Sequence, residues 1–131
     1  MLDRIDLHVE VTPVAFTELS SERIAEPSDV IRARVIKARN IQAERFKAYP
    51  GIYCNAVMGS KLLKEICVLD KASATLLKTA MEKLSLSARA YDRILKVART
   101  VADLQGSSRI RPEYIAEAIQ YRTLDRAGWA G

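Results

Sequence analysis

Apolar and polar residues alternate at the start of the chain, over the eight positions from Arg4 to Val11. This is the period of a β-strand with one apolar face. The apolar face would comprise Ile5, Leu7, Val9 and Val11. Since a lone strand is not stable by itself, the pattern predicts an orphan strand from a larger sheet. Residues 12–27 show no clean period and contain Pro13 and Pro27, so we expect a linker there.

The remaining chain is predicted to form four or five helices, whose ends are marked by local signals. Residues that can accept a hydrogen bond from a free helix amide occur at Ser28–Asp29, Asp70 and Ser87. Gly106 is typical of a helix end, and Pro112 of a helix start. The predicted helices span residues 30–46, 60–66, 71–84, 88–105 and 112–126.

Apolar residues at helical spacing define the expected core. The first helix would bury Ile31, Val35, Ala38 and Phe46. The later helices would bury Leu76, Leu77, Ala80, Met81, Leu84, Tyr91, Ile94, Leu95, Ala98, Val101, Ala102, Tyr114, Ile115, Ala118, Ile119 and Leu124. The predicted fold class is therefore all-α, with a helical bundle over residues 28–131 behind a strand and linker over residues 1–27.

The composition fits one domain and limits the compartments and partners to be expected. The chain has 131 residues, of which 49% are hydrophobic and 28% charged, which is ordinary for a globular protein. Its apolar runs are too short to span a bilayer. Two cysteines and one histidine show no metal-ligand spacing, so we expect no metal site and a reducing cytoplasm. The net charge of +5 suggests an anionic partner, either nucleic acid or a nucleotide phosphate, and a basic surface without a partner is the alternative.

Positive charge is concentrated on the first predicted helix. Arg34, Lys37 and Arg39 are candidates for contacts with DNA phosphates. An ordinary solvated face explains the same pattern equally well. No Asn or Gln is placed as in a base-reading helix.

The segment from Ser87 to Thr100 is the most informative for chemistry. Arg89, Arg93, Lys96 and Thr100 follow at spacings of four, three and four, so they share one exposed stripe. Arg89 falls in the first turn, where a cation is unfavourable by about 0.3–1 kcal/mol. Free amides and an arginine at one helix start also suit a phosphate group. The alternative is that Asp92 offsets the charge and nothing binds.

The same stretch resembles a known family. Leu84–Thr100, followed by Ala102–Asp103–Leu104, is similar to the C-terminal domain of the magnesium-chelatase-like AAA+ ATPases, closest to the ComM/YifB branch. Leu2–Val11 looks like the segment that closes the ATPase core of that family. Ile31–Val35 and Glu117–Arg122 fit as well. The resemblance covers nearly the whole chain and is weakest over residues 12–27 and 48–64.

The resemblance implies roles for three arginines. Arg89 stands where the family carries its sensor-2 arginine, which contacts the γ-phosphate of ATP, and Arg93 is a second candidate contact. Arg4 resembles an arginine finger, which reaches the ATP of a neighbouring subunit. The alternative for Arg4 is an ordinary surface arginine beside Asp3 and Asp6.

The resemblance also implies that the chain is a helical lid that senses bound ATP. The ATP, together with Mg²⁺, would be held by a longer parent protein that is an ATPase. The expected partners are the AAA+ core of the same protein and neighbouring subunits of a DNA-remodelling hexamer, with DNA as a further candidate. The chain has no Gly-x-x-x-x-Gly-Lys-Ser/Thr loop. Asp70, after the apolar run Ile66–Leu69, reads as a helix cap rather than a magnesium ligand. We therefore expect this piece to bind no cofactor alone and not to be catalytic. The competing hypothesis is a stand-alone basic helical module that binds nucleic acid.

Overall fold

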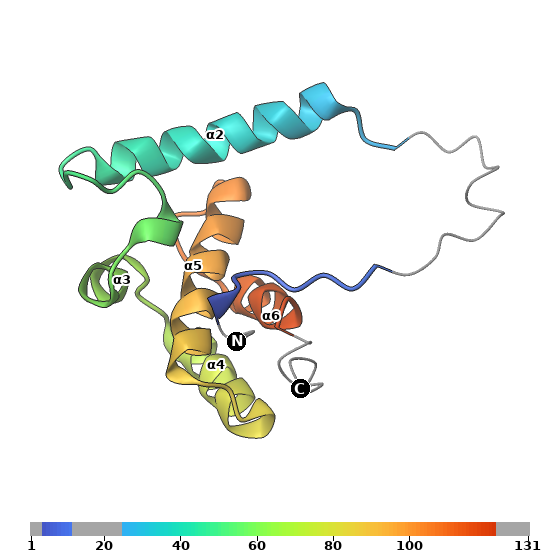
Figure 1. Cartoon of the computed structure of the whole chain (residues 1–131), viewed down its shortest axis with the longest axis vertical. Coiled ribbons are helices and arrows are strands. Elements are labelled where there is room, and N and C mark those ends of the chain that lie inside the picture. Colours follow the sequence, from blue (N-terminus) through green and yellow to red (C-terminus); the bar gives the residue numbers. More distant parts are fainter. Residues whose placement is uncertain (1–3, 12–24, 123–131) are drawn as a thin grey trace, which may run out of the picture.

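The computed structural model describes residues 4–11 and 25–122, and these form an all-α bundle, as predicted. Figure 1 shows α5 at its centre, flanked by the other helices. Helix α5 contacts α2, η2, α3 and α6, while α4 packs on α6. The elements in chain order are α2 (Ser28–Phe46), the 3-10 turn η2 (Asn55–Val57), α3 (Ser60–Ile66), α4 (Lys71–Leu84), α5 (Ala88–Leu104) and α6 (Pro112–Gln120).

Local signals fix most of the helix ends. The side chain of Asp70 accepts a hydrogen bond from the amide of Ser73, and that of Ser87 accepts one from Ala90, so both predicted caps are confirmed. Gly106 follows α5 with a φ of 69°, the left-handed conformation that glycine adopts without strain. The cap prediction at Ser28 is wrong, because Ser28 lies inside α2 and the N-cap position is Pro27, with no side-chain cap bond. Helix α6 ends at Gln120 rather than near residue 126, and residues 123–131 lie outside the described part.

The core lies where α3, α4, α5 and α6 meet. Two short connections also pair there, as an isolated parallel bridge joins Leu69 to Ile110. Tyr91 departs from the prediction, because it is 37% exposed on the outside of α5. Leu124 lies outside the described residues. The buried apolar cluster comprises Phe46, Met58, Leu63, Cys67, Leu77, Ile94, Leu95, Ala98, Ile110, Ile115 and Ala118.

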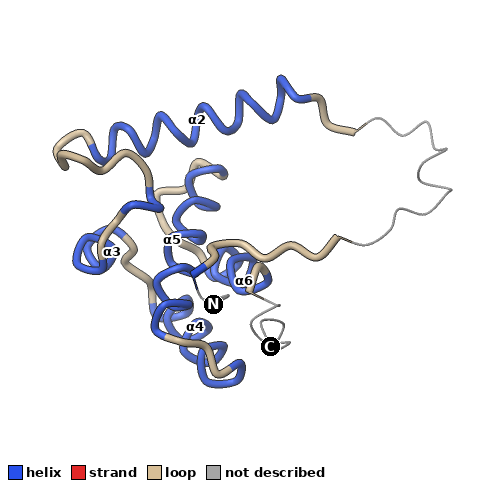
Figure 2. Tube along the Cα trace, in the orientation of Figure 1, coloured by secondary structure: helices blue, strands red, loops and turns tan. Residues whose placement is uncertain are grey.

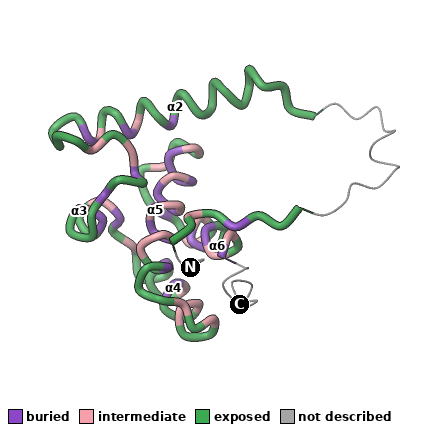
Figure 3. The backbone as a smooth tube through the Cα atoms, in the orientation of Figure 1, coloured by how far each residue is buried: buried purple, intermediate pink, exposed green. Residues whose placement is uncertain are grey.

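Helix α2 extends past the bundle, and only its second half is covered. Ala38, Gln42 and Phe46 are buried, whereas Ile31 and Val35 remain 40% and 41% exposed. The prediction that Ile31 and Val35 are core residues is therefore wrong. A helix of 19 residues is about 28 Å long at 1.5 Å per residue, and its buried residues all lie in its second half. Figure 3 shows the exposed first turns.

Residues 4–11 run along the bundle in an irregular, mostly extended conformation and form no sheet with other described residues. Figure 2 shows this segment as a loop beside α6. The predicted apolar face is exposed, with Leu7 at 49% and Val9 at 65%, while the intervening His8 is buried at 5%. The strand prediction thus fails within the described chain, because no neighbouring strand is present to cover the alternating face. Most of the predicted linker, residues 12–24, lies outside the described part.

Candidate functional site

A basic surface pocket brings together three of the arginines singled out from the sequence. It has a volume of about 330 Å³ and is lined by Arg4, Arg89, Asp92, Arg93 and Lys96. Four side chains are therefore cationic and one is acidic. Arg4 and Arg89 make no ion pair or side-chain hydrogen bond with any other residue in the described ranges. The pocket consequently presents unneutralised guanidinium groups to solvent.

Helix α5 supplies four of the five lining residues through its periodicity. Arg89 is the second residue of the helix, after the cap Ser87. It stands beside the free amide groups of the first turn, where the helix dipole disfavours a cation by about 0.3–1 kcal/mol. An anion in the pocket would reverse that penalty. Arg93 follows one turn after Arg89 and Lys96 two turns after it, on the same side of the helix. Lys96 donates through Nζ to the carbonyl of Ala56 at 3.1 Å.

Arg4 reaches the pocket because the residues that follow it are fastened to the bundle. The amide of His8 donates to the carbonyl of Tyr121 at 2.7 Å. The guanidinium of Arg122, itself 1% exposed, donates to the carbonyl of Ile5. Asp6 also pairs with Arg93, with Oδ1 and Nη1 3.3 Å apart. Sequence reasoning placed His8 on a strand and gave Arg122 no role, since neither residue carries a local signal of these contacts.

A buried polar cluster joins α2 to α5. Both nitrogens of the Arg45 guanidinium donate to the carboxylate of Asp103, at 2.9 and 2.6 Å. Arg99 lies 3.2 Å from the same carboxylate, and Asn55 donates to it at 3.0 Å. This cluster was not predicted from the sequence, where Arg45 is one of several basic residues on the first predicted helix. The available signal was the opposite charges of Arg99 and Asp103, spaced i and i+4 beside the buried face of α5.

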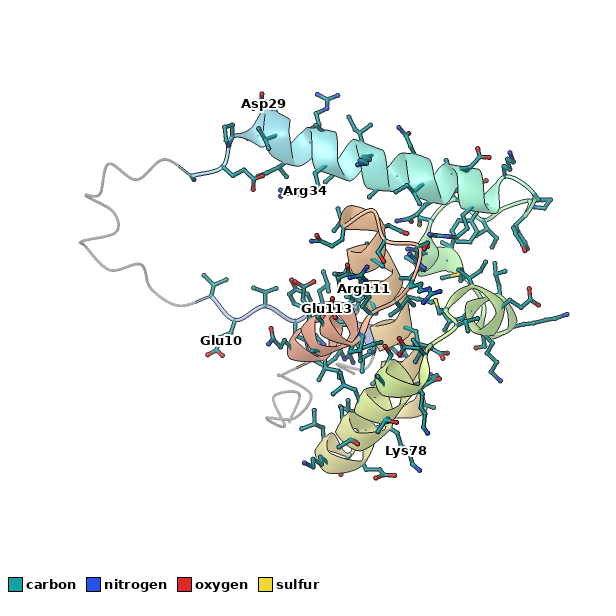
Figure 4. The ribbon with its side chains drawn as sticks, turned by 180° about the vertical axis from the view of Figure 1, so that it is seen from behind. Glu10, Asp29, Arg34, Lys78, Arg111 and Glu113 are labelled. Carbon is teal, nitrogen blue, oxygen red and sulfur yellow. The ribbon has the colours of Figure 1, made fainter. Side chains whose placement is uncertain are left out.

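The three candidate DNA contacts of α2 do not share one face. Arg34 is paired with Glu26 at 2.6 Å, and Figure 4 shows it on the side of α2 that faces the bundle. Hydrogen bonding and charge attraction by Glu26 raise the pKa of Arg34 above its usual value. At about 100° per residue, Lys37 and Arg39 point to nearly opposite sides of the helix. DNA binding through this trio stays a prediction from the sequence.

Two further features bear on the chemistry. No group of three or more metal-binding side chains occurs within residues 4–11 and 25–122, and Asp70 serves as the cap of α4. The hydrogen bond from the Ser73 amide lowers the pKa of Asp70. Over the same residues, no helix combines the length and apolarity needed to cross a membrane.

Comparison with known families places the chain. The family described as magnesium chelatase, subunit ChlI C-terminal, matches residues 25–122. The chain belongs to this family. The match includes α2 to α6, and hence Arg89, Arg93 and Lys96, whereas Arg4 lies before it.

Individual members of the magnesium chelatase C-terminal family are similar over almost the whole chain. Competence protein ComM of Haemophilus influenzae is 42% identical over 127 residues, which is 95% of this chain and 24% of ComM. YifB of Escherichia coli K12 is 35% identical over 127 residues, again 95% of this chain and 24% of the relative. An uncharacterised protein of Mycobacterium tuberculosis H37Rv is 32% identical over 122 residues, or 93% of this chain and 24% of that protein. The chain thus spans about a quarter of the length of these relatives, which confirms the predicted ComM/YifB branch.

Proposed function

We propose that this domain is the helical lid of a longer ATPase and that its basic pocket binds the phosphates of ATP. The observation that carries the proposal is the convergence of Arg4, from the N-terminal segment, with Arg89, from the start of α5. Both guanidinium groups lack partners among the described residues. Guanidinium groups that converge without counter-ions suit a phosphate group, whose oxygens accept paired hydrogen bonds.

The shared pocket changes how the two arginines would act. The resemblance assigned Arg4 to the ATP of a neighbouring subunit and Arg89 to the ATP of its own subunit. Since both line one pocket of about 330 Å³, we propose that they contact the same nucleotide. They would stabilise the negative charge that develops on the γ-phosphoryl group during transfer.

The rest of the catalytic machinery would come from outside this domain. The chain has no phosphate-binding loop of the Gly-x-x-x-x-Gly-Lys-Ser/Thr type, so ATP and Mg²⁺ would be held by the remainder of the longer protein. The lid then contributes charge and position. Because α5 forms the centre of the core, a phosphate bound at its first turn would fix the orientation of the whole bundle. A change of bound nucleotide would then rotate the lid, and neighbouring subunits would sense that rotation. Hexamer formation, DNA remodelling and a cytoplasmic location remain predictions from the resemblance.

Binding to the isolated chain tests the pocket directly. Titration with tripolyphosphate at low ionic strength should give saturable binding that weakens about tenfold in Arg89→Ala and in Arg4→Ala, as expected when one charged contact is lost. Lys78→Ala is the matched control, because it removes one cation from α4, outside the pocket (Figure 4). Absence of binding, or an equal loss in the Lys78 variant, would overturn the proposal.

Subunit mixing in the longer protein tests the shared nucleotide. Arg4→Ala or Arg89→Ala subunits would be mixed with subunits that lack their own ATP-binding loop, and ATP turnover measured. If the two arginines serve one nucleotide, both variants should be rescued, or both fail, in the same mixture. Rescue of one variant without the other would contradict the shared pocket.

A further inference from the structure

The ion pair between Asp6 and Arg93 lies at the edge of the basic pocket. Asp6 comes two residues after Arg4, and its carboxylate faces α5 from the N-terminal segment. Oδ1 of Asp6 is 3.3 Å from Nη1 of Arg93, with side chains 40% and 28% exposed, respectively. Arg93 lines the pocket, whereas Asp6 lines the neighbouring cleft between α5, α6 and α2. Arg93 therefore stands between a carboxylate of this chain and the space that a phosphate would occupy.

This pair is much looser than the ion pairs that hold the bundle together. Arg45 binds Asp103 through two hydrogen bonds in a nearly dry environment. Oδ1 of Asp6 is buried, yet it accepts no hydrogen bond from any residue in the described ranges. Because the contact between Asp6 and Arg93 is an ion pair without a hydrogen bond, the N–H groups that Arg93 directs at Asp6 remain available to another acceptor.

Positive charge in and around the pocket is only partly offset by carboxylates. Four cations line it, and Asp92 inside and Asp6 at the edge subtract two charges, which leaves a surplus of two. Asp92 also accepts a hydrogen bond from the hydroxyl of Ser60 at 3.3 Å, which engages one of its carboxylate oxygens. Asp6 is thus the carboxylate with which an incoming phosphate would compete for Arg93.

We propose that Asp6 is a built-in counter-ion that selects for highly charged phosphate chains. With the pocket empty, Asp6 neutralises Arg93. A polyphosphate with three or four negative charges displaces it and recruits Arg93 beside Arg4 and Arg89, whereas an anion of lower charge competes poorly. This inference rests on the proposed phosphate site and adds a residue that sets which anions that site accepts.

The test compares Asp6→Asn with the wild-type chain. The substitution keeps the side-chain shape and removes the competing charge, so tripolyphosphate should bind about three- to tenfold more tightly at low ionic strength. The preference for tripolyphosphate over orthophosphate should fall at the same time. Glu10→Gln is the matched control, because it makes the same change in net charge in the same segment, and Figure 4 shows Glu10 pointing away from the bundle.

A second variant pair separates release of Arg93 from a general charge effect. In an Arg93→Ala background, Asp6→Asn should not increase the affinity for tripolyphosphate, because the arginine for which Asp6 and the phosphate compete is absent. Affinity of Asp6→Asn equal to that of Glu10→Gln, or weaker than wild type, would overturn the inference. If wild type and Asp6→Asn both fail to bind tripolyphosphate, the proposed phosphate site itself fails. If binding depends on Arg89 but not on Asp6, only the role of Asp6 fails.

Discussion

Replacing Asp103 with alanine should destabilise the bundle more than any surface charge change. The side chain of Asp103 is fully buried and accepts hydrogen bonds from Arg45 and Asn55, with Arg99 also in contact. Arg45 and Arg99 are only 16% and 5% exposed. Removal of the carboxylate would leave two guanidinium groups in a poorly hydrated site with no counter-charge.

The expected loss follows from that environment. Removing one partner of a buried ion pair costs about 3–5 kcal/mol, because the remaining charge stays desolvated. Small domains are stable by about 5–15 kcal/mol in total, so Asp103→Ala should remove a large share of the free energy of unfolding. The corresponding fall in Tm is roughly 10–20 °C for a chain of this size.

Urea unfolding followed by circular dichroism measures this loss. Glu44→Ala is the control, since Glu44 pairs with Lys47 on the surface, where the two side chains are 72% and 70% exposed; it should cost less than about 1 kcal/mol. If Asp103→Ala is too unstable to purify, Asp103→Asn keeps the volume and should still lose about 1.5 kcal/mol or more. A change in either Asp103 variant no larger than that of Glu44→Ala would refute the reasoning.

Two further predictions concern a thiol and a turn. Burial raises the pKa of Cys67 to about 11. Iodoacetamide at pH 8 should therefore label the half-buried Cys54 in the native chain, and Cys67 only after unfolding. Peptide mass spectrometry would identify the labelled cysteines, and rapid labelling of Cys67 in the native chain would contradict the prediction. Gly106→Ala should lower the free energy of unfolding by about 1 kcal/mol through its φ of 69° alone, since an added Cβ would meet no atom within 4 Å. Gly59→Ala is the control, because Gly59 has an ordinary φ of −79° and is equally open; equal losses in both variants would exclude the turn as the cause.

Helix boundaries were the most predictable part of the fold. Asp70 and Ser87 each accept a hydrogen bond from the amide three residues further on, and Gly106 adopts the left-handed conformation that its own position requires. Such interactions are local, so a short stretch of consecutive residues is enough to predict them. The family and the candidacy of Arg89 followed from one continuous stretch for the same reason.

Burial at the edges of the bundle was less predictable. Ile31 and Val35 have the same helical spacing as the buried Ala38, yet they remain exposed because only the second half of α2 is covered by the bundle. Periodicity identifies the face of an element and not whether a neighbour covers it. The alternating segment around His8 shows the same limit, since its buried side depends on which partner is present.

The all-α class, most of the helix ends, the family and the candidacy of Arg89 as a phosphate contact could be predicted from the sequence, whereas the N-cap of α2 and the end of α6 could not. Tertiary structure alone decided that Arg4 meets Arg89 in one pocket, that Asp6 faces Arg93, and that Arg45 and Asp103 join α2 to α5. These contacts join residues far apart in the chain. Their geometry is set by how the helices pack, because no local pattern encodes which distant charge a side chain will reach.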